Sequence, residues 1–222
     1  MTGFAADAGV FAAENVACRR GDRLIFSNVS CGLPPGGALV LTGANGSGKS
    51  SLLRVIATLL APARGRLLWG GAPVAADLAL FRSRLLYVGH LDAIKPALGV
   101  RETLVSWTQL RGAAVSLVDT ALDAFGLEPR ADWPCRWLSA GQRRRLALAR
   151  LIASPAPLWL LDEPTAALDS DGERRLLAAL AAHRAAGGRV VLATHQPLPL
   201  ADAQTLALED FAPAPDDSLT DF

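Results

Sequence analysis

The sequence predicts an α/β fold with a mostly parallel sheet, an antiparallel β part at the N-terminus and an inserted helical subdomain. Three observations predict it. A short apolar run is followed by a glycine-rich loop and a helical pattern, further apolar runs alternate with helices in the second half, and a segment between them carries only helical patterns. Alternation of strands and helices is typical of a parallel sheet covered by helices.

Length and composition indicate a globular chain with a substantial core. The chain has 222 residues, of which 51% are hydrophobic and 19% charged. At about 150 residues per domain, this length corresponds to one or two domains that bury roughly 70% of their unfolded surface. We interpret residues 1–222 as a single domain. The net charge of +1 offers no general attraction to nucleic acid or to anionic lipid.

Cysteine usage and hydropathy restrict the cellular setting. Cys18, Cys31 and Cys135 are odd in number and lack C-x-x-C spacing, so we expect neither a disulfide framework nor a zinc site, and a reducing compartment fits best. The first residues carry no basic n-region, which argues against a signal peptide. Prolines and glycines interrupt the long uncharged stretch 24–48, so we expect no membrane-spanning helix there.

The first forty residues predict short strands separated by turns. Apolar, β-favouring runs occupy residues 11–18 and 24–26, and a third run at 38–42 follows the turn sequence Pro34-Pro35-Gly36-Gly37. The run at 38–42 is too short for a helix. Residues 49–60 then carry apolar residues at helical spacing. This order predicts a strand, a glycine-rich loop and a helix.

The second half of the chain predicts two further buried strands with a helix between them. The strands lie at residues 158–161 and 190–193, and the helix spans residues 170–186. Ser170 and Glu173 have the spacing of a capping box at the start of this helix, and Gly187-Gly188 ends it.

The segment between these parts predicts helices alone. Residues 100–110 and 117–125 have helical patterns, and Gly112 and Gly126 stop them. The expected layout is therefore a catalytic core of residues 1–90 and 141–209, a helical subdomain of residues 91–140, and a flexible acidic tail of residues 210–222.

The glycine-rich loop has the spacing of a phosphate-binding loop. The pattern G-x-x-x-x-G-K-[ST] is formed by Gly43, Ala44, Asn45, Gly46, Ser47, Gly48, Lys49 and Ser50. Glycines let backbone N–H groups approach phosphate oxygens, and the helix N-terminus adds its positive dipole end. Lys49 would bind the β and γ phosphates, and Ser50 would offer its hydroxyl to Mg²⁺. We therefore expect a P-loop NTPase core that binds ATP and Mg²⁺.

Two carboxylates and a histidine are expected at the same sheet edge. Asp162 and Glu163 follow the strand at 158–161, and His195 follows the strand at 190–193. Ligands of open α/β sheets gather at the carboxyl ends of strands. We therefore expect Asp162 to hold Mg²⁺, Glu163 to polarise the attacking water as a general base, and His195 to contact the γ-phosphate.

Other polar and aromatic residues receive structural interpretations. His183 lies in a helix rich in Ala and Arg, and we expect it on a solvated face. We expect the same for Arg143, Arg144 and Arg145. The aromatic residues of the segment 133–137 are expected to pack into the core.

These motifs resemble those of the ATP-binding cassette (ABC) ATPases. Leu138-Ser139-Ala140-Gly141-Gln142 is similar to the signature motif of that family, Asp162-Glu163-Pro164 follows at the family's spacing, and Ala167-Leu168-Asp169 resembles its D-loop. His195 resembles the family's switch histidine. The resemblance implies a head-to-tail homodimer in which Ser139 and Gly141 contact the γ-phosphate bound by the other copy, so that a monomer is nearly inactive.

Two positions depart from the family pattern. Family members usually stack adenine on an aromatic residue upstream of the P-loop, whereas this chain has Arg19-Arg20-Gly21. Base recognition therefore either uses an Arg plane or is loose. His90 stands where the family has the glutamine of the Q-loop, and as a neutral imidazole it could bind Mg²⁺ or the attacking water. Its role stays open.

Weaker marks suggest a subfamily. Gly89-His90, Ile94-Lys95, Thr194-His195-Gln196 and the length are similar to the ATPase subunits of haem exporters that serve cytochrome c maturation. This resemblance implies docking on integral membrane subunits at the cytoplasmic face of a bacterial inner membrane, energising either haem export or release of a haem-loaded chaperone. We expect no direct haem ligand in this chain and no nucleic-acid partner. The alternatives are an exporter of another small molecule, a soluble ATPase acting on nucleic acid or ribosomes, and a nucleotide-dependent assembly switch.

Overall fold

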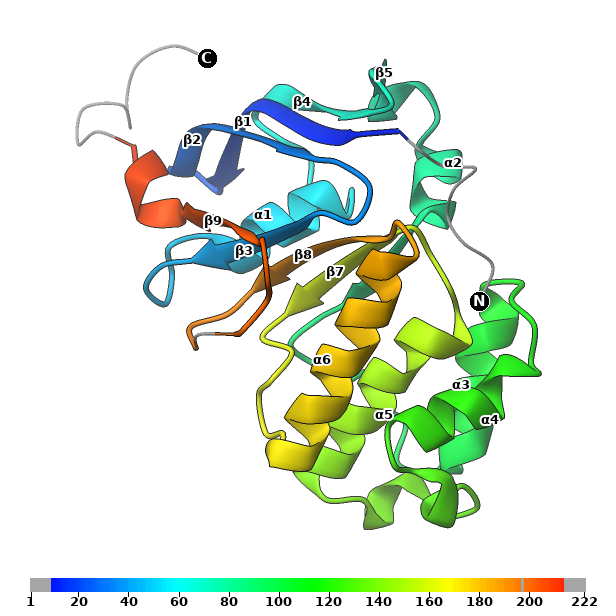
Figure 1. Cartoon of the computed structure of the whole chain (residues 1–222). Coiled ribbons are helices and arrows are strands. Elements are labelled where there is room, and N and C mark those ends of the chain that lie inside the picture. Colours follow the sequence, from blue (N-terminus) through cyan, green and yellow to red (C-terminus); the bar gives the residue numbers. More distant parts are fainter. Residues whose placement is uncertain (1–8, 197, 214–222) are drawn as a thin grey trace.

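Two β-sheets enclose a helix and organise the chain (Figure 1). The computed structural model describes residues 9–196 and 198–213. The first sheet is antiparallel and has the strand order β2-β1-β4-β5. Its strands are β1 (Phe11–Arg20), β2 (Arg23–Leu33), β4 (Arg64–Trp69) and β5 (Ala72–Pro73).

The second sheet is parallel and has the strand order β6-β7-β8-β3-β9. Its strands are β3 (Ala38–Thr42), β6 (Leu85–Val88), β7 (Leu158–Asp162), β8 (Arg189–Ala193) and β9 (Gln204–Ala207). Helix α1 (Lys49–Ile56) lies between the two sheets, as Figure 1 shows.

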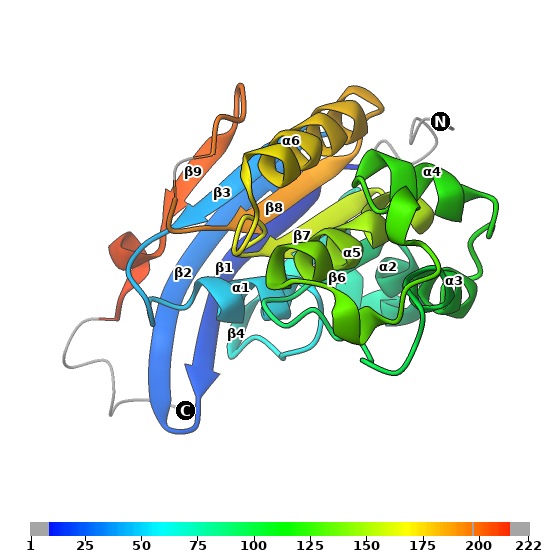
Figure 2. The same ribbon diagram turned by 90° about the horizontal axis from the view of Figure 1, so that it is seen from below.

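Helices cover the other face of the parallel sheet (Figure 2). They are α3 (Val100–Leu110), α4 (Leu117–Ala124), α5 (Ala140–Ala153) and α6 (Ser170–Ala185). The remaining helical elements are short: η2 (Val74–Ala76), α2 (Leu78–Ser83), η3 (Glu128–Arg130), η4 (Cys135–Trp137) and η5 (Leu208–Phe211). Among the helices of the described residues, none combines the length and the apolar character needed to cross a bilayer.

The central strands β7 and β8 are mostly apolar because both of their faces are buried. Trp159 and Leu161 of β7 belong to a core shared with α3, α4, α5 and α6, whereas Leu158 and Leu160 belong to a core shared with α1 and the antiparallel sheet. Alternate side chains of a strand point to opposite faces. Burial on both faces therefore explains the continuous apolar runs from which these strands were predicted.

The predicted fold class is confirmed: an antiparallel N-terminal part, a parallel sheet and a helical insert are all present. The strand predicted at 24–26 is longer, and the helix predicted to reach residue 60 ends at Ile56 because Thr58 has a left-handed φ of 56°. The predicted capping box was wrong. Asp169 is the N-cap of α6, and its carboxylate accepts from the Gly172 N–H at 2.8 Å.

The end of the chain is described only in part. Phe211 of η5 packs against the core that lies between the two sheets. The predicted flexible tail, residues 210–222, falls mostly on residues 214–222, which lie outside the described residues.

The prediction that the aromatic residues of segment 133–137 enter the core was wrong. Trp133 and Trp137 are 41% and 61% exposed, and their rings meet edge to face at a centroid distance of 6.2 Å. The side chain that is buried is Cys135, at 1% exposure. Arg130 and Arg136 lie over the two indole rings, so the exposed pair is covered by cations instead of by core.

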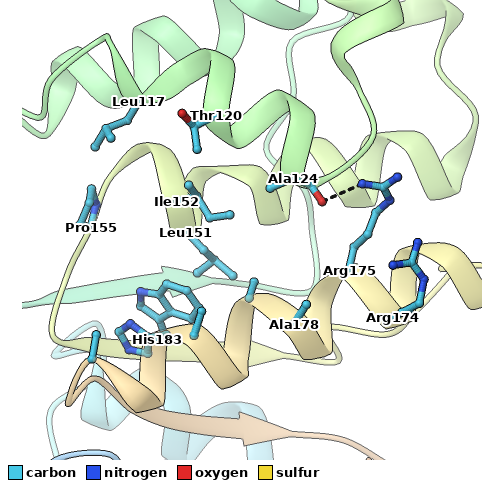
Figure 3. Close-up of a pocket in the computed structure, with 14 residues that line it drawn as sticks. Leu117, Thr120, Ala124, Leu151, Ile152, Pro155, Arg174, Arg175, Ala178 and His183 are labelled. Atoms are coloured by element: carbon cyan, nitrogen blue, oxygen red, sulfur yellow. Dashed lines mark hydrogen bonds between the residues drawn. The ribbon is translucent and has the colours of Figure 1, made fainter. Parts of the chain in front are cut away.

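His183 is also buried, against the prediction of a solvated face. Its exposure is 3%, and its ring stacks on Trp159 with 3.7 Å between centroids and 7° between planes. A Cβ on Gly188 would lie 2.1 Å from His183 Cε1, so only glycine fits against the other side of the ring. The stacked ring lines an apolar pocket of about 610 Å³ between α4, α5 and α6 (Figure 3).

This burial predicts a stability that falls in mild acid. Burial lowers the pKa of His183 from 6.5 to about 4, so the folded chain resists a proton that the unfolded chain accepts. Stability contributed by the neutral ring is present above pH 6.5 and is lost as the pH falls towards 4, by about 3 kcal/mol in total. Urea unfolding across pH 4 to 7 measures this loss.

The matched control is His183→Phe, which keeps an aromatic ring and removes the titration. We expect its free energy of unfolding to fall by about 3 kcal/mol less than that of the unaltered chain over the same pH range. An equal fall in both proteins would show that the acid sensitivity comes from other groups.

Candidate nucleotide-binding site

The carboxyl ends of four parallel strands bring the predicted site residues to one edge. The loop 43–48 leaves β3, His90 follows β6, Asp162 ends β7, and His195 follows β8. The register pairs Asp162 with Ala193 of β8 and Leu41 of β3 with the same residue. Residues far apart in the sequence therefore share the end of one sheet.

The loop 43–48 depends on glycine conformations. Gly43, Gly46 and Gly48 have φ values of 131°, 86° and 106°, which other residues rarely adopt. At Gly48 the space is also closed, because a Cβ would lie 2.7 Å from Ile25 Cγ2 of β2. Gly48 is the N-cap of α1 and supplies no capping side chain, so the first N–H groups of the helix remain open to an anion.

Lys49 is a buried cation at this helix N-terminus. It is 7% exposed, and its Nζ donates to Gly43 O at 2.6 Å and to Ala44 O at 3.0 Å. Both partners are neutral carbonyls, and none of the ion pairs among the described residues includes Lys49. A buried charge normally has a counter-charge, so this position calls for an anionic ligand.

A hydroxyl and a carboxylate meet beside Lys49. Ser50 Oγ donates to Asp162 Oδ1 at 2.9 Å, and Tyr87 Oη donates to Asp162 Oδ2 at 3.4 Å. Asp162 is 2% exposed. Burial raises the pKa of Tyr87, and the Asp162 charge raises it further, so the phenol stays protonated as a donor. Each carboxylate oxygen of Asp162 therefore accepts a hydrogen bond from one hydroxyl group.

Glu163 and His195 form a pair next to this carboxylate. His195 Nδ1 lies 2.8 Å from Glu163 Oε2, an arrangement in which the ring N–H donates to the carboxylate. Glu163 has a φ of 48°, which is left-handed and uncommon for a residue with a side chain. Its N–H donates to Ala193 O at 2.9 Å.

A pocket of about 320 Å³ lies beside this group of residues, although His195 and Tyr87 are not among the described residues that line it. Its lining includes Lys49, Ser50, His90, Asp162 and Glu163, together with Ile25 and four residues of the segment 45–51. His90 is exposed and faces the same pocket. Within the described part of the chain, no three His, Cys, Asp or Glu side chains converge as a metal cluster.

Ser139 and Gly141 are not among the described residues that line this pocket. Ser139 is the N-cap of α5: its Oγ accepts from Gln142 N at 3.2 Å, while its N–H donates to Gln142 Oε1 at 2.9 Å. Gly141 passes so close to Ala167 that a Cβ would lie 2.7 Å from the Ala167 carbonyl oxygen. This close approach requires glycine whatever ligand the motif binds.

Arg144 corrects the prediction of a solvated Arg face. It is 3% exposed, whereas Arg143 and Arg145 are partly exposed. Its guanidinium donates to the carbonyl oxygens of Asp162 and Glu163 at 2.7 and 2.8 Å. The sequence could have indicated this burial, because Leu148 and Leu151 lie four and seven residues after Arg144 and therefore share its face of α5.

Glu209 is a second residue that sequence reasoning missed. It follows β9, and its Oε1 accepts from the Ala44 N–H at 2.6 Å. A lone acid near the end of the chain carried no signal for this contact with the phosphate-binding loop. The contact joins η5 to the loop after β3.

Comparison with known proteins identifies the family and agrees with the fold. The ABC transporter family model matches residues 26–166. A relative from Rhodospirillum rubrum, the cytochrome c biogenesis ATP-binding export protein CcmA, is 58% identical over 96% of this chain and 91% of its own length. The protein of the same name from Paramagnetospirillum magneticum is 52% identical over 92% of this chain and 96% of its own length.

Solved structures share the fold. A bacterial Atm1-family ABC exporter with ATP bound superposes with a TM-score of 0.79 at 24% identity, over 90% of this chain and 37% of that one. A family match over more than half of the sequence and relatives this similar along nearly its whole length settle the family. The chain belongs to the ABC transporter family and is an ATP-binding ABC ATPase.

Proposed function

We propose that this chain is the ATP-hydrolysing subunit of an exporter in cytochrome c biogenesis, acting as a homodimer docked on integral membrane subunits. The observation that carries the ATPase part is Lys49, a buried cation with neutral partners at the open N-terminus of α1. The cytochrome c part rests on the relatives named CcmA.

The phosphates of ATP would lie along the loop 43–50. Lys49 would exchange its two carbonyl contacts for the β and γ phosphate oxygens, which are stronger acceptors. Ser47 Oγ is buried and has no hydrogen-bond partner among the described residues, as expected of a donor that a ligand completes. Gly43, Ala44, Asn45, Gly46 and Gly48 would supply backbone contacts to the same phosphates.

Mg²⁺ fits the oxygen atoms beside this loop. Ser50 Oγ and Asp162 Oδ1 already converge at 2.9 Å, and Mg²⁺ takes one or two carboxylates together with substrate phosphates and water. A single carboxylate is therefore enough for Mg²⁺ here, and a cluster of three or more His, Cys, Asp or Glu side chains is not required. When bound, the ion would neutralise charge on the β and γ phosphates. His90 faces the pocket and remains a candidate for binding Mg²⁺ or the attacking water.

Hydrolysis would use Glu163 as the general base. Its carboxylate lines the pocket beside Asp162 and Lys49, where it would accept a proton from the attacking water. His195 holds this carboxylate through the 2.8 Å contact and would also reach the γ-phosphate. The adenine contact near Arg19 and Arg20 stays a prediction.

Two copies would complete each site. Ser139 and Gly141 stand at the N-terminus of α5 and do not line the pocket of their own chain, as far as the described residues extend. A second copy placed head to tail would bring them to the γ-phosphate, and the helix N-terminus would then favour the anion.

The exporter would work at a bacterial inner membrane, with this chain on its cytoplasmic face. Either haem export or release of a haem-loaded chaperone would be the energised step, and haem would touch the membrane subunits instead of this chain. The alternatives are an exporter of another small molecule and a soluble nucleotide-dependent assembly switch.

Lys49→Ala tests phosphate binding. Because it removes the buried charge, we expect hydrolysis to be abolished and ATP affinity to fall by about 10- to 100-fold, measured with a fluorescent ATP analogue. The control is Lys95→Ala, which removes the only other lysine, an exposed one. Normal hydrolysis by Lys49→Ala would refute the phosphate-binding role of the loop.

Glu163→Gln tests the general base. The variant should bind ATP normally, accumulate as an ATP-bound dimer in size-exclusion chromatography, and lose about 10²- to 10⁴-fold in turnover. Glu128→Gln, an exposed carboxylate on η3, should behave as the unaltered chain. Unchanged turnover in Glu163→Gln would remove Glu163 as the base.

Co-purification tests the transporter assignment. A tagged full chain, extracted from membranes in mild detergent, should bring integral membrane proteins with it and no nucleic acid. Cells that carry only the Glu163→Gln chain should contain less mature cytochrome c, measured by haem staining of gels. Recovery of RNA or ribosomes instead of membrane proteins would favour a soluble ATPase.

A further inference from the structure

Arg144 of α5 is a buried charge that the proposed mechanism does not use. It is 3% exposed, and its guanidinium reaches five acceptors. Three are the consecutive carbonyl oxygens of residues 162–164, at 2.7, 2.8 and 3.3 Å. The others are Gly89 O at 2.8 Å and Asp92 Oδ1 at 3.1 Å. One side chain thus joins the turn after β7 to the segment after β6.

Arg144 binds the backbone turn that orients the Glu163 side chain. This residue is left-handed, with a φ of 48°, a conformation that persists only where the surroundings over-determine it. Its N–H is fixed by Ala193 O of β8, and its carbonyl oxygen is fixed by Arg144. The guanidinium also binds the carbonyl oxygens on either side. The backbone from which the Glu163 carboxylate projects is therefore fastened from both directions.

The same guanidinium fixes the segment that carries His90. Gly89 and Asp92 stand on either side of this residue, and both accept from Arg144 Nη1. Arg144 itself lies five residues after Ser139, at the start of the helix that begins with the signature motif. A planar guanidinium with five fixed N–H donors can span such a set of acceptors, which an ammonium group cannot.

From these contacts we propose that Arg144 is a positioning residue for hydrolysis: it holds the Glu163 turn and the His90 segment in register with each other and with the signature helix. Arg144 is not among the described residues that line the nucleotide pocket. It acts through Glu163, so movement of the 89–92 segment is transmitted to the general base. The proposal rests on the ATPase function and adds a residue to it.

Arg144→Gln in the full chain, purified with its membrane partners, tests the proposal. We expect kcat for ATP to fall by about 10- to 100-fold, since small displacements of a catalytic group have effects of this size, while KM stays within about twofold. The matched control is Arg145→Gln. Arg145 is one residue further along α5 and contacts Phe125 O and Asp171 instead, so its variant should keep both constants.

A double-mutant cycle separates positioning from a general structural defect. In the Glu163→Gln background, where the base is already gone, we expect Arg144→Gln to change residual single-turnover hydrolysis by less than about threefold. An undiminished loss in that background, a change confined to KM, or an equal loss in Arg145→Gln would overturn the proposal.

Arg144→Lys keeps the test open if the Gln variant does not fold. It retains the buried charge opposite Asp92 but lacks the planar fork, and we expect a loss of kcat between those of the unaltered chain and Arg144→Gln. Normal kcat in a folded Lys variant would overturn the proposal. Failure of the ATPase function would look different, because the unaltered chain would then hydrolyse no ATP and Glu163→Gln would change nothing.

Discussion

The arrangement of this chain depends on a positive charge that is buried without a negatively charged partner among the described residues. Lys49 is 7% exposed and contacts two carbonyl oxygens, at a helix N-terminus that no side chain caps. Desolvation makes such a charge costly, and a triphosphate is the ligand that would offset the cost. Phosphate binding at this site would explain why the loop is rich in glycine and why a carboxylate lies beside Ser50.

The parallel sheet turns this local feature into a site. Four strand ends contribute to it: the loop follows β3, His90 follows β6, Asp162 and Glu163 lie at the end of β7, and His195 follows β8. Strands buried on both faces hold these ends rigidly. Helix α5 reaches the same edge through Arg144, which binds the backbone of the acidic turn. This helix is thus linked to the reacting groups by hydrogen bonds and not only by packing.

The sequence predicted the fold class and brought the loop 43–50, Asp162 and Glu163 to one sheet edge, because glycine spacing and apolar runs are local signals. It did not predict the environment of single polar side chains, which tertiary contacts decide. His183 looked solvated in a helix rich in Ala and Arg, yet Trp159 and Gly188 enclose its ring. Arg144 looked like part of a charged face, yet its acceptors come from segments about 20 and 50 residues away. Strands β4, β5, β6 and β9 were missed. β5, β6 and β9 have four residues or fewer, which carry little pattern, and β4 begins with the polar run Arg64-Gly65-Arg66.

A structure of the full-length Glu163→Gln chain with Mg²⁺ and ATP tests the central claim most directly. We expect two chains head to tail, with the β and γ phosphates within hydrogen-bond distance of Lys49 Nζ and the ion on Ser50 Oγ. We also expect Ser139 of the other copy at the γ-phosphate. Nucleotide bound elsewhere, for example in the apolar pocket between α4, α5 and α6, or phosphates that leave Lys49 on its carbonyls, would contradict the claim.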